Sequence, residues 1–182
     1  IDGVFNHCGW RFFAFRDAVK NGRRSSFWPW FHRLCEAVQI PEQPGTCPGY
    51  ECFGYERMMP KLATDHPAVI AYFCEVGAYW VREFDIDGWR LDVASEVCDV
   101  FWRAFRRAVK EVKPDCALIG EVWESAPHWL DGSMFDSTMN YDFRRHLKRF
   151  FADGSIPAAA FDARVTDMLM RYRLPYAYSQ LN

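Results

Sequence analysis

The chain contains 182 residues, of which 50% are hydrophobic and 18% aromatic, and its formal net charge is -2. This composition can supply the core of about one domain and differs from that of a disordered segment. The small net charge excludes a broad basic surface for nucleic acid, and no apolar run approaches the ~20 residues of a membrane-spanning helix. We therefore expect neither a nucleic-acid partner nor a membrane partner.

The first residues, "IDGVFNH", are typical of the end of a strand, and the sequence begins with Ile rather than Met. The last residues, "YAYSQLN" (176–182), are typical of the beginning of another strand. We expect the chain to be an internal piece of a longer protein. A missing signal peptide then says little about the destination of that protein.

Residues 8–60 mix Gly, Pro, Cys and aromatic residues without a clear period. So long a connection inside a compact chain usually has a function. A regular pattern begins at Thr64, where Thr64 or Asp65 can cap a helix and Pro67 suits its first turn. The apolar stripe of this helix is Val69, Phe73, Val76, Trp80 and Phe84.

Strands and helices then alternate along the chain. The expected strands are 86–93, 116–123 and 135–141, and the expected helices are 98–112, a segment from 143 to about 154 and a segment from 157 to before Pro175. Short apolar strands separated by helices favour a parallel sheet in an α/β fold. A doubly wound sheet and a TIM barrel both fit this pattern.

Seven cysteines lie at scattered positions, and their odd number favours free thiols in a reducing compartment over a disulfide framework. Cys47 and Cys52 are the closest pair, and no second pair stands at the spacing of metal ligands. Because a closed zinc site needs four ligands, we expect no metal site. Because free thiols indicate a reducing compartment, we expect the protein in the cytoplasm.

Two carboxylates interrupt apolar strands near their ends. Asp92 closes the strand 86–93 and Glu121 closes the strand 116–123, which is a separation of about one βαβ unit. Equivalent positions on neighbouring parallel strands reach the same rim, and the C-terminal rim is where such sheets place their chemistry. We expect the two side chains to face one cavity.

Arg90 stands two residues before Asp92 and therefore on the same face of the strand. A neighbouring guanidinium lowers the pKa of a carboxyl group, whereas the apolar neighbours Ile119 and Val122 are expected to raise the pKa of Glu121. One charged and one protonated carboxyl group is the arrangement used in glycoside hydrolysis. The alternative is a structural ion pair at Arg90 and a structural role for Glu121.

Four sequence blocks, in this order and spacing, resemble the alpha-amylase superfamily of glycoside hydrolases. They are "DGVFNH" (2–7), "MPKL" (59–62), "GWRLDVASE" (88–96) and "GEVW" (120–123), and they look most like the neopullulanase, cyclomaltodextrinase and maltogenic amylase branch. The resemblance implies a partial TIM (β/α)8 barrel from about the end of strand three to the start of strand seven. The whole chain, 1–182, is then a fragment of the catalytic barrel domain, and 8–60 includes an excursion after strand three.

Matched residue by residue, the resemblance places Asp92 on the catalytic nucleophile and Glu121 on the general acid/base. Arg90 falls on the arginine that bonds the nucleophile, and His7 on a histidine that contacts the sugar. Asn6 matches a calcium ligand of many alpha-amylases, but this branch often works without calcium, so no cofactor is required and calcium is not expected. For Asn6, and for Asp2, we favour a buried hydrogen-bonding role.

Aromatic rings stack on the apolar faces of sugars, and four candidates lie at rim or loop positions. Trp123 is favoured because it stands two residues after Glu121, ahead of Trp129, Tyr50 and Tyr55. His32, His66 and His128 show no ligand spacing, and we expect solvated or capping roles for them.

The resemblance implies a retaining hydrolase of α-glucosidic bonds in maltooligosaccharides, cyclodextrins or pullulan. The bonds are α-1,4, with α-1,6 bonds left open. An α-1,6-glucosidase, a glucanotransferase and a non-catalytic amylase-like protein are the alternatives. The partner is an α-glucan oligosaccharide, and a homodimer is left open for the parent protein. The third acid of the family belongs to a block on strand seven that is not in this sequence, so we expect this chain alone to be inactive.

Overall fold

The computed structural model describes residues 1–32, 35, 38 and 48–180. Its centre is a parallel sheet with the strand order β1-β2-β3-β4. The strands are β1 (Asp2–Val4), β2 (Gly88–Asp92), β3 (Ala117–Gly120) and β4 (Ser137–Thr138). All three pairs of neighbours run parallel, so the carboxyl ends of the four strands lie along one rim. The prediction of parallel strands connected by helices is confirmed.

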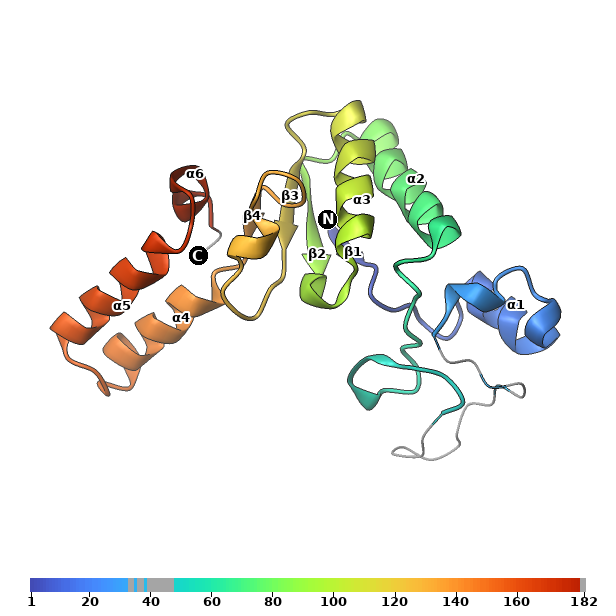
Figure 1. Cartoon of the computed structure of the whole chain (residues 1–182), viewed down its shortest axis with the longest axis horizontal. Coiled ribbons are helices and arrows are strands. Elements are labelled where there is room, and N and C mark those ends of the chain that lie inside the picture. Colours follow the sequence, from blue (N-terminus) through green and yellow to red (C-terminus); the bar gives the residue numbers. More distant parts are fainter. Residues whose placement is uncertain (33–34, 36–37, 39–47, 181–182) are drawn as a thin grey trace.

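Two helices cover one face of this sheet. Figure 1 shows α2 (Pro67–Phe84) and α3 (Asp99–Val112) side by side above the strands. Alternate residues of β2 point toward them, and Trp89 and Leu91 are buried there. Because side chains alternate along a strand, Arg90 and Asp92 point to the opposite face.

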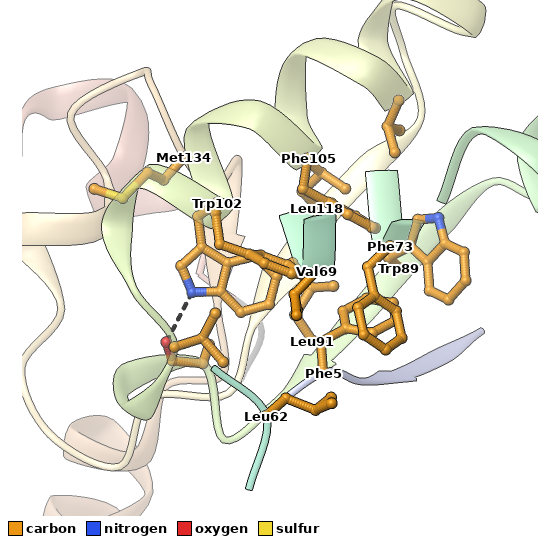
Figure 2. Packing of buried hydrophobic residues seen from close by; sticks show 14 of the residues in the cluster. Phe5, Leu62, Val69, Phe73, Trp89, Leu91, Trp102, Phe105, Leu118 and Met134 are labelled. Carbon is orange, nitrogen blue, oxygen red and sulfur yellow. Dashed lines mark hydrogen bonds between the residues drawn. The ribbon is translucent and has the colours of Figure 1, made fainter. Parts of the chain in front are cut away.

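The core between the sheet and the helices is largely aromatic (Figure 2). Phe5 lies near its centre, in ring contact with five aromatic residues, which are Phe73, Trp89, Phe101, Trp102 and Phe105. Gly77 lets α2 approach α3, since a Cβ atom there would lie 2.4 Å from the ring of Phe105. The apolar stripe predicted for α2 is confirmed only in the first half of the helix, where Val69 and Phe73 are buried. Trp80 and Phe84 are exposed, and the buried residues of the second half are Gly77, Ala78 and Val81.

The beginning of α2 differs from the prediction. His66 is the N-cap, and its side chain accepts a hydrogen bond from the Ala68 N–H at 3.2 Å, while Pro67 is the first helical residue. Thr64 instead accepts from the Cys98 N–H at 3.1 Å, immediately before α3. The capping role assigned to Thr64 or Asp65 is therefore wrong, and the side chain of Thr64 connects the starts of the two helices.

The segment 8–60 is more regular than predicted. It contains α1 (Phe13–Asn21), whose Ala14, Phe15 and Ala18 are buried. The sequence pattern missed this helix because the buried stripe is short and Phe12, at the N-cap, provides no side-chain cap. Three shorter helical turns are Gly22–Arg24, Trp28–Trp30 and Phe53–Tyr55.

After β4 the chain forms helices that extend away from the sheet (Figure 1). The two helices expected here are confirmed as α4 (Tyr141–Leu147), which continues as a π-helix over Lys148–Ala152, and α5 (Ala158–Met170). The strand expected from residue 176 is wrong at its start, because α6 (Leu174–Tyr178) includes residues 176–178. The last two residues of the expected strand, 181–182, lie outside the described residues. Pro175 lies in the first turn of α6, where its missing N–H costs nothing.

The cysteines at positions 8, 35, 74, 98 and 116 have free thiols, and Cys52 is partly buried. Cys74 lies in α2, Cys98 precedes α3, and Cys116 is buried directly before β3. The seventh, Cys47, lies outside the described residues. Within the described part of the chain, no helix combines the length and the hydropathy that a membrane crossing requires.

Candidate active site

The ends of β2 and β3 carry the two predicted carboxylates to one rim of the sheet. Asp92 is the last residue of β2. Glu121 follows β3, and its N–H donates to the Leu91 carbonyl at 2.8 Å, so the strand pairing continues to this point. The Asp92 and Glu121 carboxyl groups lie close enough for Glu121 to raise the pKa of Asp92. The prediction of a shared rim is confirmed.

Arg90 joins these carboxylates. Its Nη1 lies 2.6 Å from Oδ1 of Asp92, and its Nη2 lies 2.7 Å from Oε1 of Glu121. The predicted contact between Arg90 and Asp92 is confirmed, and the contact with Glu121 adds a second function for the same guanidinium. Burial opposes its charge, but its carboxylate partners hold the pKa of Arg90 above its ordinary value.

Asp2, on β1, is a third carboxylate on Arg90, at 2.8 Å from Nη1. Its side chain is 57% exposed, so the buried role expected for Asp2 is wrong. Asn6 fulfils that expectation, because it is fully buried and its Nδ2 lies 3.5 Å from both Glu96 Oε2 and His7 Nδ1. Among the described residues the Asn6 Oδ1 atom has no hydrogen-bond partner.

Glu121 receives several donors. Its Oε1 accepts from the Tyr141 hydroxyl at 2.8 Å as well as from Arg90, and its Oε2 accepts from the Val93 N–H at 3.2 Å. The side chain of Trp123 also lies close enough to lower the pKa of Glu121. Tyr141 was not singled out in the sequence, and its only signal was its position as the last residue of the expected strand 135–141.

The pKa values of the two carboxyl groups are each shifted in the direction opposite to the predicted one. Burial raises the pKa of Glu121, as expected, but the donors Val93 and Tyr141, together with Trp123 and Arg90, outweigh it and leave the pKa below its ordinary value. Burial and the neighbouring Glu121 raise the pKa of Asp92 despite Arg90. The prediction failed because apolar sequence neighbours do not reveal which donors reach a side chain.

His7 lies close to the same rim. Its ring stacks on Phe53 with centroids 4.8 Å apart and planes 1° from parallel. Burial lowers the pKa of His7, and the charges of Asp92 and Glu96 act in the opposite direction. A neutral imidazole within the field of Asp92 can donate a hydrogen bond to a sugar hydroxyl.

Of the aromatic candidates, Trp123 is half exposed and contacts Glu121, so its indole is accessible beside the carboxyl pair. Tyr50 is buried and its hydroxyl donates to the Arg57 carbonyl at 2.6 Å. A stacking role for Tyr50 is therefore wrong. Tyr55 is almost fully exposed, and Trp129 is partly buried against the core.

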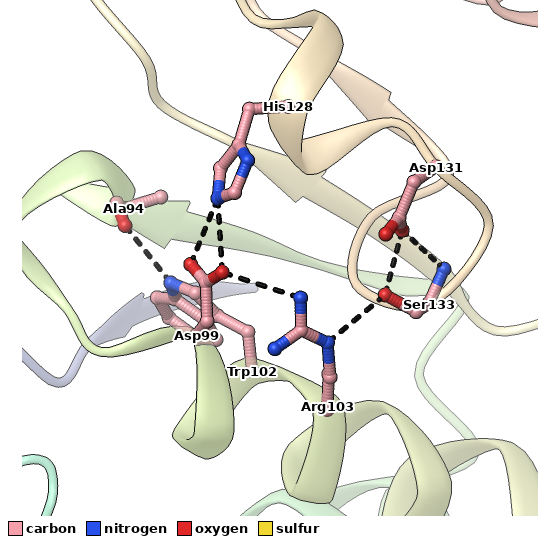
Figure 3. Close-up of polar contacts among 7 residues, drawn as sticks. All are labelled: Ala94, Asp99, Trp102, Arg103, His128, Asp131 and Ser133. Carbon is pink, nitrogen blue, oxygen red and sulfur yellow. Dashed lines mark hydrogen bonds and ion pairs between the residues drawn. The ribbon is translucent and has the colours of Figure 1, made fainter.

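The loop that carries Trp123 is attached to α3 by polar contacts (Figure 3). Asp99 accepts from Arg103 at 3.2 Å and contacts His128 Nε2 at 2.9 Å, and Arg103 reaches Ser133 Oγ at 3.3 Å. His128 is exposed, so a solvated position is confirmed, although it also pairs with Asp99. These contacts limit the movement of the loop after β3.

A cavity of about 460 Å³ lies beside His7 and is lined mainly by apolar residues, which include Cys8, Phe12, Met58, Met59 and Phe73. Neither Asp92 nor Glu121 lines this cavity. The two carboxylates meet instead at the strand ends. No group of three or more His, Cys, Asp or Glu side chains in the described part of the chain could hold a metal ion, and the expectation about calcium stays a prediction.

A pair of carboxyl groups at the C-terminal rim of neighbouring parallel strands is the arrangement of α/β glycoside hydrolases. The model of the alpha-amylase catalytic domain matches residues 1–174, and the chain belongs to this family.

Three curated relatives carry names of one branch. A cyclomaltodextrinase of Thermoanaerobacter pseudethanolicus is 48% identical over 173 residues, 94% of this chain and 29% of the relative. Neopullulanase 2 of Thermoactinomyces vulgaris is 46% identical over the same shares. An intracellular maltogenic amylase of Bacillus subtilis is 45% identical over 93% of this chain and 28% of the relative. The chain therefore spans less than a third of the relatives it matches.

Solved structures give the same result. The structure of a cyclomaltodextrinase matches the whole of this chain with a TM-score of 0.94 and 41% identity. The match covers 31% of the cyclomaltodextrinase. A cyclic alpha-maltosyl-(1→6)-maltose hydrolase of Arthrobacter globiformis, in complex with that sugar, has a TM-score of 0.92 and 34% identity, and 40% of it is covered. The resemblance stated from the sequence blocks is confirmed.

Proposed function

We propose that the protein carrying this chain is a retaining hydrolase of α-glucosidic bonds. The observation that carries the proposal is the contact of Arg90 with both Asp92 and Glu121 at one rim. In this proposal β1 to β4 are strands three to six of a (β/α)8 barrel, residues 1–182 belong to the catalytic domain, and 8–60 includes the excursion after strand three.

The reaction proceeds in two steps. A carboxylate oxygen of Asp92 attacks the anomeric carbon, the bond from that carbon to the leaving oxygen breaks, and Glu121 gives its proton to the leaving oxygen. Water then attacks the glycosyl ester on Asp92, and its proton goes to Glu121. Both carboxyl groups return to their starting states, and the configuration at the anomeric carbon is retained.

The pKa values of the free site have a consequence for this cycle. Attack requires a charged Asp92 and a protonated Glu121, whereas in the free site the pKa of Asp92 is raised and the pKa of Glu121 is lowered from its ordinary value. Each carboxyl group acts on the titration of the other, so the apparent pKa values belong to the pair rather than to either residue.

Three further residues complete the binding function. Arg90 orients both carboxyl groups, His7 donates to a sugar hydroxyl at the cleavage point, and the exposed indole of Trp123 stacks on a sugar ring. The stacking proposal is supported by the half-exposed position of Trp123 next to Glu121.

The substrates we propose are maltooligosaccharides, cyclodextrins and pullulan, cleaved at α-1,4 bonds. The names of the relatives support this choice. Cleavage at α-1,6 bonds is a second candidate, supported by the α-(1→6)-linked cyclic sugar after which the Arthrobacter hydrolase is named. We also propose a cytoplasmic location, supported by the free thiols and by the word intracellular in the name of the Bacillus subtilis relative.

The proposal is tested in the full-length protein that carries this sequence. Asp92→Asn should abolish formation of a covalent glycosyl ester, detected by mass spectrometry with a fluorinated glucosyl fluoride, while oligosaccharide binding persists. Glu121→Gln should slow maltooligosaccharide cleavage by about 10²–10⁴-fold but slow glucosyl fluoride turnover much less, because fluoride leaves without a proton. Asp87→Asn, exposed just before β2, is the control.

Four outcomes would decide between this proposal and its rivals. Parental cleavage rates in both variants would remove the assigned roles. Products of inverted configuration, seen by NMR, would exclude the retaining mechanism. Binding without any turnover in the unsubstituted protein would favour the non-catalytic alternative, and dominant transfer to sugar acceptors would favour a glucanotransferase.

A further inference from the structure

Tyr141 is fixed at the rim by the start of α4. The helix begins after Asn140, whose side chain accepts from the Phe143 N–H at 3.1 Å. This capping contact sets the first turn of α4, and the Tyr141 hydroxyl points from that turn to Oε1 of Glu121 at 2.8 Å. A residue from a helix beyond β4 thus reaches the carboxyl group at the end of β3.

The two oxygens of Glu121 are not equivalent. Oε1 lies 2.8 Å from the Tyr141 hydroxyl and 2.7 Å from Arg90 Nη2. Oε2 has a longer contact of 3.2 Å with the Val93 N–H. A proton on Oε1 would face the Arg90 guanidinium, which has no acceptor atom for it. The proton would therefore displace at least one of the two short contacts of Oε1, with Arg90 or with Tyr141. A proton on Oε2 disturbs only the longest of the three.

We propose that Tyr141 is a positioning residue that, together with Arg90, keeps Oε1 of Glu121 unprotonated and so places the transferable proton on Oε2. This inference rests on the proposed function, since it concerns the acid of that reaction. When Glu121 has delivered its proton, the Tyr141 hydroxyl donates to a full negative charge, and hydrogen bonds to charged acceptors are roughly twice as strong as neutral ones. Tyr141 therefore favours release of the proton.

The sign of the effect on titration follows from the groups that face Glu121. These are Arg90 and Asp92 from β2, the Trp123 side chain and Tyr141 from α4. The Tyr141 hydroxyl lowers the pKa of Glu121. The pKa of Tyr141 itself is raised, mainly by burial and also by its hydrogen bond to Glu121. Loss of the hydroxyl must raise the proton affinity of Glu121. Because Asp92 and Glu121 titrate as a pair, the sum of their two apparent pKa values is the quantity that rises.

Tyr141→Phe removes the hydroxyl and keeps the ring, and Tyr79→Phe is the matched control. Tyr79 is half exposed on α2, and its hydroxyl has no hydrogen bond among the described residues. In the full-length protein, Tyr141→Phe should raise the sum of the two apparent pKa values of kcat/KM by about one pH unit. It should lower kcat/KM for maltooligosaccharides about tenfold and for 4-nitrophenyl maltoside by less than twofold, because the activated leaving group needs little protonation. Tyr79→Phe should change neither quantity.

A direct titration separates this inference from the proposed function. Carbon-13 labelling of glutamate side chains, with Glu121→Gln to assign the signal, follows Glu121 whether or not the protein turns over. If the unsubstituted protein shows no hydrolysis, the proposed function fails, while a higher Glu121 midpoint in Tyr141→Phe still supports the contact. If the protein is active and Tyr141→Phe slows both substrates equally without moving either pKa measure, Tyr141 has only a structural role and the inference is wrong.

Discussion

The backbone N–H of Val93 reaches Oε2 of Glu121 because Val93 adopts the left-handed conformation, with φ 47° and ψ 42°. This region is sterically unfavourable for a β-branched side chain, and such residues persist only where the surrounding structure holds them. Ala94 provides that restraint. Its N–H donates to the Glu121 carbonyl at 3.0 Å, and its carbonyl accepts from Trp102 Nε1 at 2.8 Å. Local backbone strain therefore positions a donor on the proposed acid.

The strain at Val93 predicts an unusual order of stability for two substitutions. Val93→Ala and Val93→Gly both lose the buried side chain, but only glycine adopts a positive φ without cost. Val93→Gly should therefore be the more stable variant, by about 1 kcal/mol, in urea unfolding. At Val100, which is exposed in α3, glycine should be less stable than alanine by about 1 kcal/mol. The same order at both positions would mean that Val93 is not strained.

Sequence reasoning located the carboxylates well, for a physical reason. Asp92 and Glu121 interrupt apolar runs where the strands leave the core, and a parallel sheet brings such positions to one rim. The face of each residue follows from the alternation along a strand, which also predicted the contact between Arg90 and Asp92. These features depend on local periodicity, which a single sequence contains.

What the sequence could not supply were contacts between distant segments. Tyr141 reaches Glu121 across β4, and Asp2 reaches Arg90 across the pair β1 and β2. The Tyr141 hydroxyl is one of the donors that lower the pKa of Glu121, against the expected direction. In α6 the periodicity itself misled, because a short segment of alternating aromatic residues fits a strand as well as a helix.

Asp136 provides a test of pH dependence. It lies just before β4, and Arg106, Lys110 and the Leu118 N–H all donate to it at 2.7–2.9 Å. Burial raises the pKa of Asp136, but these donors outweigh burial and hold it below its ordinary value. The unfolded chain then takes up a proton first as the pH falls. The stability from this carboxylate is present above pH ~4 and is lost below it.

Asp136→Asn should accordingly lower the free energy of unfolding by about 1–2 kcal/mol near neutral pH. The difference from the parent chain should shrink as the pH is lowered from about 5 to 3, since the parent then loses the charge as well. Asp153→Asn, at an exposed position, should have no effect at either pH. A constant difference across this range would show that Asp136 acts through shape rather than charge.

The cysteines give a chemical test of the predicted redox state. Thiol titration of the unfolded, unreduced protein should recover nearly all seven thiols. In the folded protein, exposed Cys35 should react first, because burial raises the pKa of the Cys8 thiol to about 12 and Cys116 is buried. Recovery near one thiol after unfolding would mean three disulfides and an oxidising compartment.

A pair of buried tryptophans separates the hydrogen bond at Ala94 from the packing around it. Trp102 and Trp89 are 1% and 2% exposed, and both lie in the core of Figure 2. Trp102 Nε1 donates to the Ala94 carbonyl, whereas Trp89 Nε1 has no hydrogen-bond partner among the described residues. Replacement by phenylalanine removes a similar apolar volume in both cases. Only Trp102→Phe also leaves a buried carbonyl without its donor.

We therefore expect Trp102→Phe to lower the free energy of unfolding by about 1–3 kcal/mol more than Trp89→Phe, measured by urea unfolding. The effect should extend to the site, because Ala94 restrains Val93 and Val93 donates to Glu121. Loss of that donor raises the pKa of Glu121, so its carbon-13 titration midpoint should rise in Trp102→Phe and stay unchanged in Trp89→Phe. Equal destabilisation by the two variants, with the Glu121 midpoint unmoved, would mean that Val93 holds its conformation without the Trp102 hydrogen bond.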